Sequence, residues 1–112
     1  MEANQGNSMH FDIIAKNQYT VIRIKEARFD AKLTASFHVE LGKLKDNLRE
    51  HLLLDMSDVR FMDSSGLGAI MGTYKMLRNT KISIINPQKP ILDLLKLTRI
   101  DKLIVSHATI ED

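Results

Sequence analysis

The feature that most constrains the fold of this chain is an alternation between β-type and helix-type hydrophobic patterns. Residues 19–25 (YTVIRIK) alternate apolar and polar side chains and are rich in β-branched residues, which is typical of a half-buried strand. Residues 31–49 instead repeat apolar residues at spacings of three and four, which predicts one buried face of a helix: Leu33, Phe37, Leu41, Leu44 and Leu48. The fold must therefore combine strands with helices.

The remaining segments continue this alternation. Residues 51–56 are a short, nearly continuous apolar run, as in a central strand that is covered on both faces. The order ββαβαβαβ predicts an α/β fold with a mostly parallel central sheet packed by helices. In chain order we expect a strand over 9–15 that pairs as a hairpin with 19–25, a helix over 31–49, a strand over 51–56, a helix over 65–79, a strand over 81–86, a short helix from Pro90 and a last strand at 103–105.

The chain has 112 residues, which is the size of one domain. Because residues 1–8 are polar, we expect them to form a flexible N-terminus, and residues 9–112 to form the domain. The net charge of +2 is small and there is no Trp to stack on bases, so direct binding of nucleic acid is not expected. The lack of Cys excludes disulfides, thiolate zinc sites and Cys nucleophiles.

The same composition disfavours membrane and metal chemistry. No apolar run approaches the ~18 residues of a membrane span, so membrane insertion is not expected. The chain begins without the basic residues and apolar segment of an export signal, so we expect a cytoplasmic location. Because the four histidines show no ligand spacing with one another, we expect no metal and no cofactor: His10, His38, His51 and His107.

The most informative segment is Met62–Gly68, with the sequence MDSSGLG, where a central strand has ended and a helix begins. In open α/β sheets, functional groups gather at the carboxyl ends of strands. The first N–H groups of a helix are unpaired and carry the positive end of its dipole, so Asp63 or Ser64 should cap them. Because Gly66 and Gly68 add no side-chain bulk, we expect the Ser64 hydroxyl to be exposed to another protein.

Four interpretations of this segment remain open on its residues alone. The plainest is that Asp-Ser-Ser is an N-cap and that the glycines let the helix pack closely on the sheet. A phosphate-binding loop is disfavoured because no Lys follows the glycines in the G-x-x-x-x-G-K-[ST] register. A nucleophile elbow is disfavoured because G-x-S-x-G is absent. The fourth is a serine that another protein phosphorylates, which requires only exposure and a partner.

A longer stretch carries a family resemblance. Residues 53–68 (LLDMSDVRFMDSSGLG) resemble the sulphate transporter and anti-sigma factor antagonist (STAS) domain, in the form of the free-standing bacterial anti-sigma factor antagonists. The hallmark of that form is a strand ending in Asp, a short connection, and D-S-[ST]-G-L-G at the start of a helix. The resemblance includes the element order, Phe29-Asp30 before the first helix and Asn86-Pro87 after a later strand, and covers about residues 10–106.

The resemblance implies a regulatory switch and not an enzyme. In such antagonists the first Ser of the motif, here Ser64, is phosphorylated by the anti-sigma factor, which is a serine kinase, and a PP2C-type phosphatase removes the phosphate. The unmodified protein binds the anti-sigma factor and relieves inhibition of its target, and the phosphorylated protein does not. Whether Ser65 can substitute for Ser64 stays open. The alternative is a STAS domain that is not phosphorylated and is a structural or regulatory subunit of a transport or stress-sensing complex.

The expected partner surface surrounds Ser64 and continues along the second helix. Instead of binding a partner, Asp30 could cap the first helix. The small residues of the second helix, Gly68, Gly72 and Thr73, could instead let that helix pack closely on its own sheet. A sensor or hydrolase that uses Ser64 and Asp63 is disfavoured because no His has an evident role beside them. The candidate partner-binding residues are Asp30, Met62, Asp63, Ser65, Gly66, Leu67, Gly68, Gly72 and Thr73.

Overall fold

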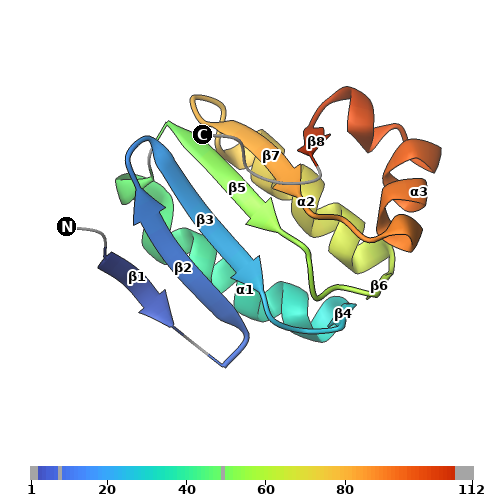
Figure 1. Cartoon of the computed structure of the whole chain (residues 1–112), viewed down its shortest axis with the longest axis horizontal. Helices are drawn as coiled ribbons and strands as arrows, with labels where there is room; N and C mark the ends of the chain where they lie inside the picture. The colour runs from blue at the N-terminus through green and yellow to red at the C-terminus, as the bar shows by residue number, and fades with distance from the viewer. Residues whose placement is uncertain (1–2, 8, 49, 108–112) are drawn as a thin grey trace.

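The computed structural model of the chain describes residues 3–7, 9–48 and 50–107. Its main sheet has six strands in the order β1-β2-β3-β5-β7-β8 (Figure 1). The β1–β2 and β2–β3 pairs are antiparallel, and the β3–β5, β5–β7 and β7–β8 pairs are parallel, so the predicted α/β fold is confirmed. The strands are β1 (Ala3–Asn7), β2 (Phe11–Lys16), β3 (Tyr19–Ile24), β5 (His51–Asp55), β7 (Lys81–Ile85) and β8 (Val105–His107).

Strands β2 and β3 form the hairpin that the sequence predicts. Their register runs without interruption from Phe11 opposite Ile24 to Lys16 opposite Tyr19. The connecting turn contains Asn17 with a φ of 54°, a left-handed conformation that Asn tolerates better than most residues. The buried pairs Phe11–Ile24 and Ile13–Ile22 thus face the same side of the sheet, whereas Ile14 and Val21 face the other side.

The N-terminus differs from the expected flexible segment. Residues 3–7 form β1, which pairs with β2 from Ala3 opposite Ala15 to Asn7 opposite Asp12. The register shifts between Asn4 and Gly6, as at a β-bulge. The physical reason is that β2 would otherwise be the edge strand, and its outer N–H and C=O groups accept a further strand even from a polar segment.

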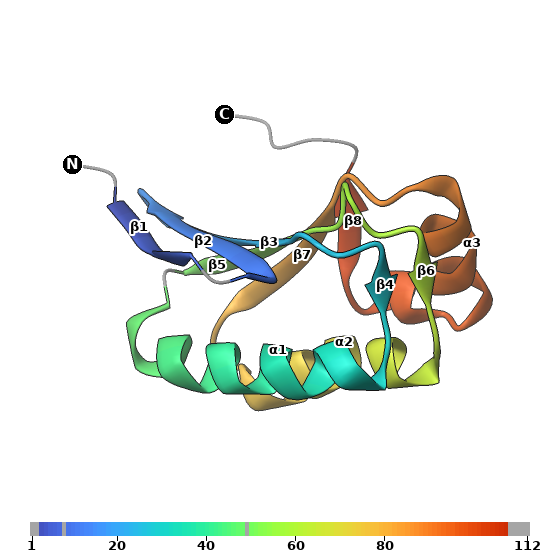
Figure 2. The ribbon, with the colours of Figure 1, turned by 90° about the horizontal axis from the view of Figure 1, so that it is seen from below.

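Two long helices cover one face of the sheet. Helix α1 (Ala31–Leu44) and helix α2 (Ser64–Met76) lie side by side beneath it, and α3 (Lys89–Leu97) lies beyond its β8 end (Figure 2). Helix α1 is shorter than the predicted 31–49, because the chain tightens into a 3₁₀ turn, η1 (Lys45–Asn47), and becomes extended at Leu48. Helix α2 ends before the predicted residue 79, because Leu77 leaves the helical region at φ −108° and ψ 67°.

The segment after α3 also differs from the prediction of a strand over 103–105. A second 3₁₀ turn, η2 (Ile100–Lys102), precedes Leu103 and Ile104, whose N–H groups both donate to the Ile100 carbonyl at 2.9 Å. Strand β8 therefore begins at Val105. The apolar pattern that suggested a strand reflects burial of Ile104 in the core.

The core lies between the sheet and helices α1 and α2. Phe37 of α1 contacts the rings of Phe11 and Phe29, with centroid separations of 6.0 and 5.5 Å. Phe29 belongs to a second, two-stranded parallel sheet that the sequence does not predict, formed by β4 (Arg28–Phe29) and β6 (Phe61–Met62). Two-residue strands are too short to show a hydrophobic period.

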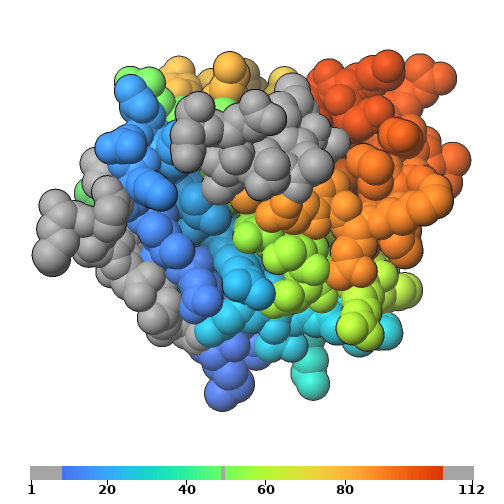
Figure 3. Space-filling view, viewed as in Figure 1, coloured from blue at the N-terminus to red at the C-terminus, as the bar shows by residue number. Residues whose placement is uncertain are grey.

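On the other face, no helix of the described chain covers β2 and β3, which appear in blue at the surface in Figure 3. The Cα radius of gyration is 12.8 Å, close to the ~13 Å expected for a single domain of about 100 residues.

None of the helices in the described ranges is long and apolar enough to cross a bilayer.

Candidate functional site

Ser64 is the first residue of α2 and its side chain is exposed. Asp63 precedes it with extended backbone angles and caps the helix: its Oδ1 accepts from the N–H of Ser65 at 2.9 Å and of Gly66 at 3.2 Å. Among the described residues no hydrogen bond uses the Ser64 hydroxyl. The cap thus holds the backbone around a hydroxyl that remains available to another molecule.

Gly66 lets the start of α2 approach the small sheet closely. A Cβ at this position would lie 2.5 Å from the Phe29 carbonyl oxygen and 2.6 Å from Cγ of Met62. The Asp63 N–H donates to the same Phe29 oxygen at 3.4 Å. No side chain fits there without displacing backbone, so Gly66 fixes the position of Ser64 relative to β4.

Helix α1 begins beside α2 and, like α2, follows a two-residue strand and is capped by an Asp. Strand β4 pairs with β6 so that Phe29 is opposite Met62, and each strand is followed by an Asp that caps a helix. Asp30 Oδ1 accepts from the Leu33 N–H at 3.3 Å. The Thr34 hydroxyl lies 2.9 Å from the Asp30 carbonyl oxygen and 3.3 Å from that of Ser65, and so links the first turns of the two helices.

The small residues of α2 divide between two sides of the helix. Ala69 and Thr73 are buried, and the Thr73 hydroxyl donates to the Ala69 carbonyl at 2.8 Å. A Cβ added at Gly68 or Gly72 would meet nothing within 4 Å. These two glycines are therefore not needed for packing on the sheet, which was one of the two interpretations left open by the sequence.

The candidate partner-binding residues fall into an interior group and an accessible group. The interior group consists of Met62, Gly66 and Thr73, which are buried and support the site from below. The accessible group, which we call the α2 surface, consists of Asp30, Asp63, Ser64, Ser65, Leu67, Gly68 and Gly72.

Sequence reasoning missed three residues beside this surface. The Arg28 guanidinium carbon lies 4.2 Å from the centroid of the Phe61 ring, and its Nε lies 3.8 Å from Asp30 Oδ2. Phe61 remains 41% exposed, so an aromatic ring borders the α2 surface. Thr34 is the third. In the sequence, the role of Phe61 was indicated only by its being an apolar residue directly before Met62. No local pattern indicated the link through Thr34.

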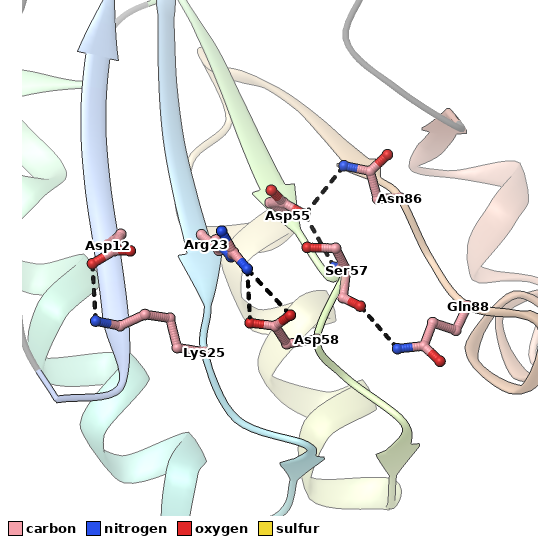
Figure 4. Close-up of polar contacts among 8 residues, drawn as sticks. All are labelled: Asp12, Arg23, Lys25, Asp55, Ser57, Asp58, Asn86 and Gln88. Atoms are coloured by element: carbon pink, nitrogen blue, oxygen red, sulfur yellow. Dashed lines mark hydrogen bonds and ion pairs between the residues drawn. The ribbon is translucent and has the colours of Figure 1, made fainter.

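A polar network holds the connection between β5 and β6 that leads to the site (Figure 4). Asp55 Oδ1 accepts from the Ser57 N–H at 3.0 Å and from Asn86 Nδ2 at 3.3 Å. Gln88 donates to the Ser57 carbonyl at 2.8 Å. Asp55 is therefore a structural residue at the carboxyl end of its strand.

The same connection is held from the other side by an ion pair. Asp58 accepts two hydrogen bonds from the Arg23 Nη2 atom, at 3.1 and 3.2 Å (Figure 4). Backbone N–H groups of Arg60 and Phe61 both donate to the Ala27 carbonyl, at 2.8 and 3.0 Å. The loop before Ser64 is thus tied to β3, to the segment after β7 and to the segment before β4.

The structure is thus a single α/β domain that presents an exposed serine at the N-terminus of a helix whose first turn is closely held. The family model of the STAS domain matches residues 9–112 of the chain. The chain belongs to the STAS domain family.

Proteins with similar sequences are named as antagonists of anti-sigma factors. An anti-sigma F factor antagonist from Paenibacillus polymyxa is 34% identical over 56 residues, which is 48% of this chain and 48% of that protein. The aligned part thus spans about half the length of that relative.

Solved structures share the fold. An anti-sigma factor antagonist from Mycobacterium paratuberculosis matches with a TM-score of 0.80 and 20% identity, over 89% of this chain and 86% of that one. The anti-sigma factor antagonist SpoIIAA has been solved unphosphorylated, with a TM-score of 0.72, 16% identity and 86% coverage of both chains. Its phosphorylated form from Bacillus has a TM-score of 0.66 and 16% identity, over 86% of this chain and 89% of that one.

Proposed function

We propose that this chain is an anti-sigma factor antagonist that works as a phosphorylation-controlled switch in the cytoplasm. In its unmodified form it binds an anti-sigma factor with serine kinase activity and so relieves inhibition of that factor's target. Phosphorylation of Ser64 by the same kinase ends the complex, and a PP2C-type phosphatase restores it. The chain acts by binding and is itself a substrate, with no catalytic residue of its own.

The observation that carries this proposal is the exposed Ser64 hydroxyl at the first position of α2, beside a capping carboxylate. The relative from Paenibacillus polymyxa is named as an antagonist of an anti-sigma factor, and SpoIIAA exists in both phosphorylated and unphosphorylated forms. Both names support the same role for this chain.

The electrostatics of the site suit a switch that leaves the fold intact. A phosphate on Ser64 adds about −1.5 to −2 charges at pH 7 next to the Asp63 carboxylate, which already faces the same helix end. The positive end of the α2 dipole partly stabilises that charge, so α2 persists. A partner that packs against a neutral Ser64 would instead meet repulsion and a costly desolvation of the phosphate.

The accessible residues around Ser64 give the partner surface its proposed extent. Asp30, Asp63 and Ser65 lie at the two helix starts, and Leu67, Gly68 and Gly72 continue along α2. Because Gly68 and Gly72 have open space where a side chain would stand, a partner's backbone can approach this side of the helix closely. Met62, Gly66 and Thr73 act from beneath by holding this surface in place.

The decisive experiment is the mass of the native protein purified from its own cells, followed by fragmentation across residues 61–74. We expect a fraction that is about 80 Da heavier, the mass of one phosphate, with the addition on Ser64. In a Ser64→Ala variant the heavier fraction should disappear, and in a matched Ser65→Ala variant it should remain.

Two other results would change the proposed site or the proposed function. Modification on Ser65 in the wild type would move the switch by one residue. An unmodified mass in all growth states, together with loss of partner capture by Ser64→Ala, would contradict a phosphoswitch and favour a structural subunit of a transport or stress-sensing complex.

A further inference from the structure

A cavity of about 640 Å³ lies at the end of α2 that is remote from Ser64. Its walls come from the last turn of α2, the start of β7 and Leu103, with His51 of β5 on one side. The volume is in the range of small-molecule sites. Ser64 and Lys75 are eleven residues apart on the helix, or roughly 16 Å at about 1.5 Å per residue, so the cavity is separate from the proposed switch.

The cavity exists because β8 covers only part of β7. The β7–β8 pairing begins with Ser83 opposite Val105, so Lys81 and Ile82 lie before the first paired residue. Along that stretch of β7, no strand of the described chain pairs on the β8 side, and Leu103 stands beyond the gap. The hollow is thus walled partly by an open strand edge.

Three cationic side chains line the cavity. Lys75 lies in the last turn of α2, Arg78 in the turn that follows the helix and Lys81 at the start of β7, and all three are exposed. No ion pair joins any of them to a carboxylate within the described residues. Among the residues that the structure describes, no Asp or Glu lines the cavity. Glu50 appears only in an adjoining hollow that shares His51 and Lys81.

Apolar surface lies beside these cations. Tyr74 is 40% exposed and Leu103 is 49% exposed, and both line the cavity above the buried side chains of Leu77 and Ile82. At the floor, His51 Nε2 and Ser83 Oγ are joined by a hydrogen bond of 2.9 Å, with Ser83 buried. Cations without carboxylate partners next to exposed apolar walls are complementary to a ligand that is itself both anionic and apolar.

We infer that this cavity binds a small organic anion. Its phosphate, sulfonate or carboxylate head would pair with Lys75, Arg78 and Lys81, and its aromatic or aliphatic body would cover Tyr74 and Leu103. The inference does not depend on the phosphorylation of Ser64, because it concerns the opposite end of α2.

The test is a two-dimensional NMR titration of the full chain with 8-anilinonaphthalene-1-sulfonate, which carries both a charged head and an aromatic body. We expect saturable shifts in the amides of residues 74–83 and of Leu103, and none in residues 63–68. The neutral analogue N-phenyl-1-naphthylamine and inorganic phosphate should each bind at least tenfold more weakly. The inference would be overturned by chemical-shift changes scattered over the surface. It would also be overturned if the neutral analogue or inorganic phosphate bound as tightly as the sulfonate probe.

Variants make the test specific. The double substitution Lys75→Gln/Arg78→Gln should weaken binding at least tenfold, whereas Lys45→Gln/Lys96→Gln, which removes two exposed cations elsewhere, should change it less than twofold. Leu103→Ser should weaken the sulfonate probe and leave the response to phosphate unchanged. All four substituted cations are exposed, so a wild-type spectral dispersion is expected for both double variants; equal weakening by both would contradict a defined site.

Discussion

At the residue scale, the three glycines of α2 have opposite roles. Gly66 is enclosed by the Phe29 carbonyl and Met62, whereas Gly68 and Gly72 have open space where a side chain would stand. Each glycine in a helix interior costs about 0.5–1 kcal/mol relative to Ala. The cost at Gly68 and Gly72 is not offset by packing within the chain, which is consistent with a requirement of the proposed partner surface.

Alanine at these glycines should therefore change stability in opposite directions. Gly66→Ala should lower the free energy of unfolding by about 1–3 kcal/mol, because its Cβ would overlap backbone and force the start of α2 to move. Gly68→Ala should raise it by about 0.5–1 kcal/mol. Urea denaturation of both variants measures this. Equal effects of the two substitutions would mean that the close approach at Gly66 is absent in solution.

The cap residue Asp63 gives a second prediction at this scale. Asp63→Ala removes the acceptor for two N–H groups and should cost about 0.5–2 kcal/mol of stability. Asp93→Ala, at an exposed position in α3 with a surface ion pair to Lys89, should cost less than about 0.5 kcal/mol. Thermal or urea unfolding of the two variants compares them, and the expected order would be contradicted if Asp93→Ala were the more destabilising.

At the scale of elements, the loop between β5 and β6 is held by two carboxylates in different surroundings. Asp55 satisfies a backbone N–H and a side-chain amide at the strand end, and it is half-buried. Both oxygens of Asp58 accept from a single nitrogen of Arg23, and both side chains are substantially exposed. Water and salt compete for the second contact much more than for the first.

We therefore expect the two carboxylates to differ in their contribution. Asp55→Ala should cost about 1–3 kcal/mol, because the Ser57 N–H and Asn86 amide lose their acceptor. Asp58→Ala should cost less than about 1 kcal/mol, and 1 M salt should reduce that difference further. Hydrogen exchange of residues 56–62 would locate the effect; faster exchange in Asp58→Ala than in Asp55→Ala would reverse the assignment.

At the scale of the whole molecule, the proposed switch needs no change of fold. The caps by Asp30 and Asp63, the Thr34 link and the Gly66 contact all hold the two helix starts whether or not Ser64 carries a charge. An added negative charge at a helix N-terminus is favourable to the helix by about 0.3–1 kcal/mol. The regulation would then act on the interface alone.

The Ser64→Asp variant should thus unfold within a few degrees of the wild type and show NMR shifts confined to residues near the two helix starts. Its affinity for the anti-sigma factor should fall by roughly a hundredfold, which corresponds to about 2.7 kcal/mol. Ser65→Asp is the matched control. Unchanged binding by a folded Ser64→Asp protein would refute the switch, and widespread shifts would refute a switch without refolding.

Most of the fold could be predicted from the sequence, because hydrophobic period identifies long elements. The hairpin of β2 and β3, the buried β5 and the two long helices each carry a pattern over several residues. The misses share a cause: β1 is polar, β4 and β6 are two residues long, and the apolar Leu103 and Ile104 belong to a turn after η2. No hydrophobic period distinguishes β1, β4 or β6 from a loop, and none distinguishes the turn at Leu103 and Ile104 from a strand.

The sequence by itself determined the α/β order of elements and the position of Ser64 at a strand-to-helix junction, because local hydrogen bonding and hydrophobic period are encoded along the chain. Only the tertiary structure decided which small residues of α2 face the sheet. It also decided that Thr34 links the two helix starts, and that a cationic cavity opens where β8 stops short. These features depend on contacts between segments that are far apart in the sequence, which no local pattern specifies.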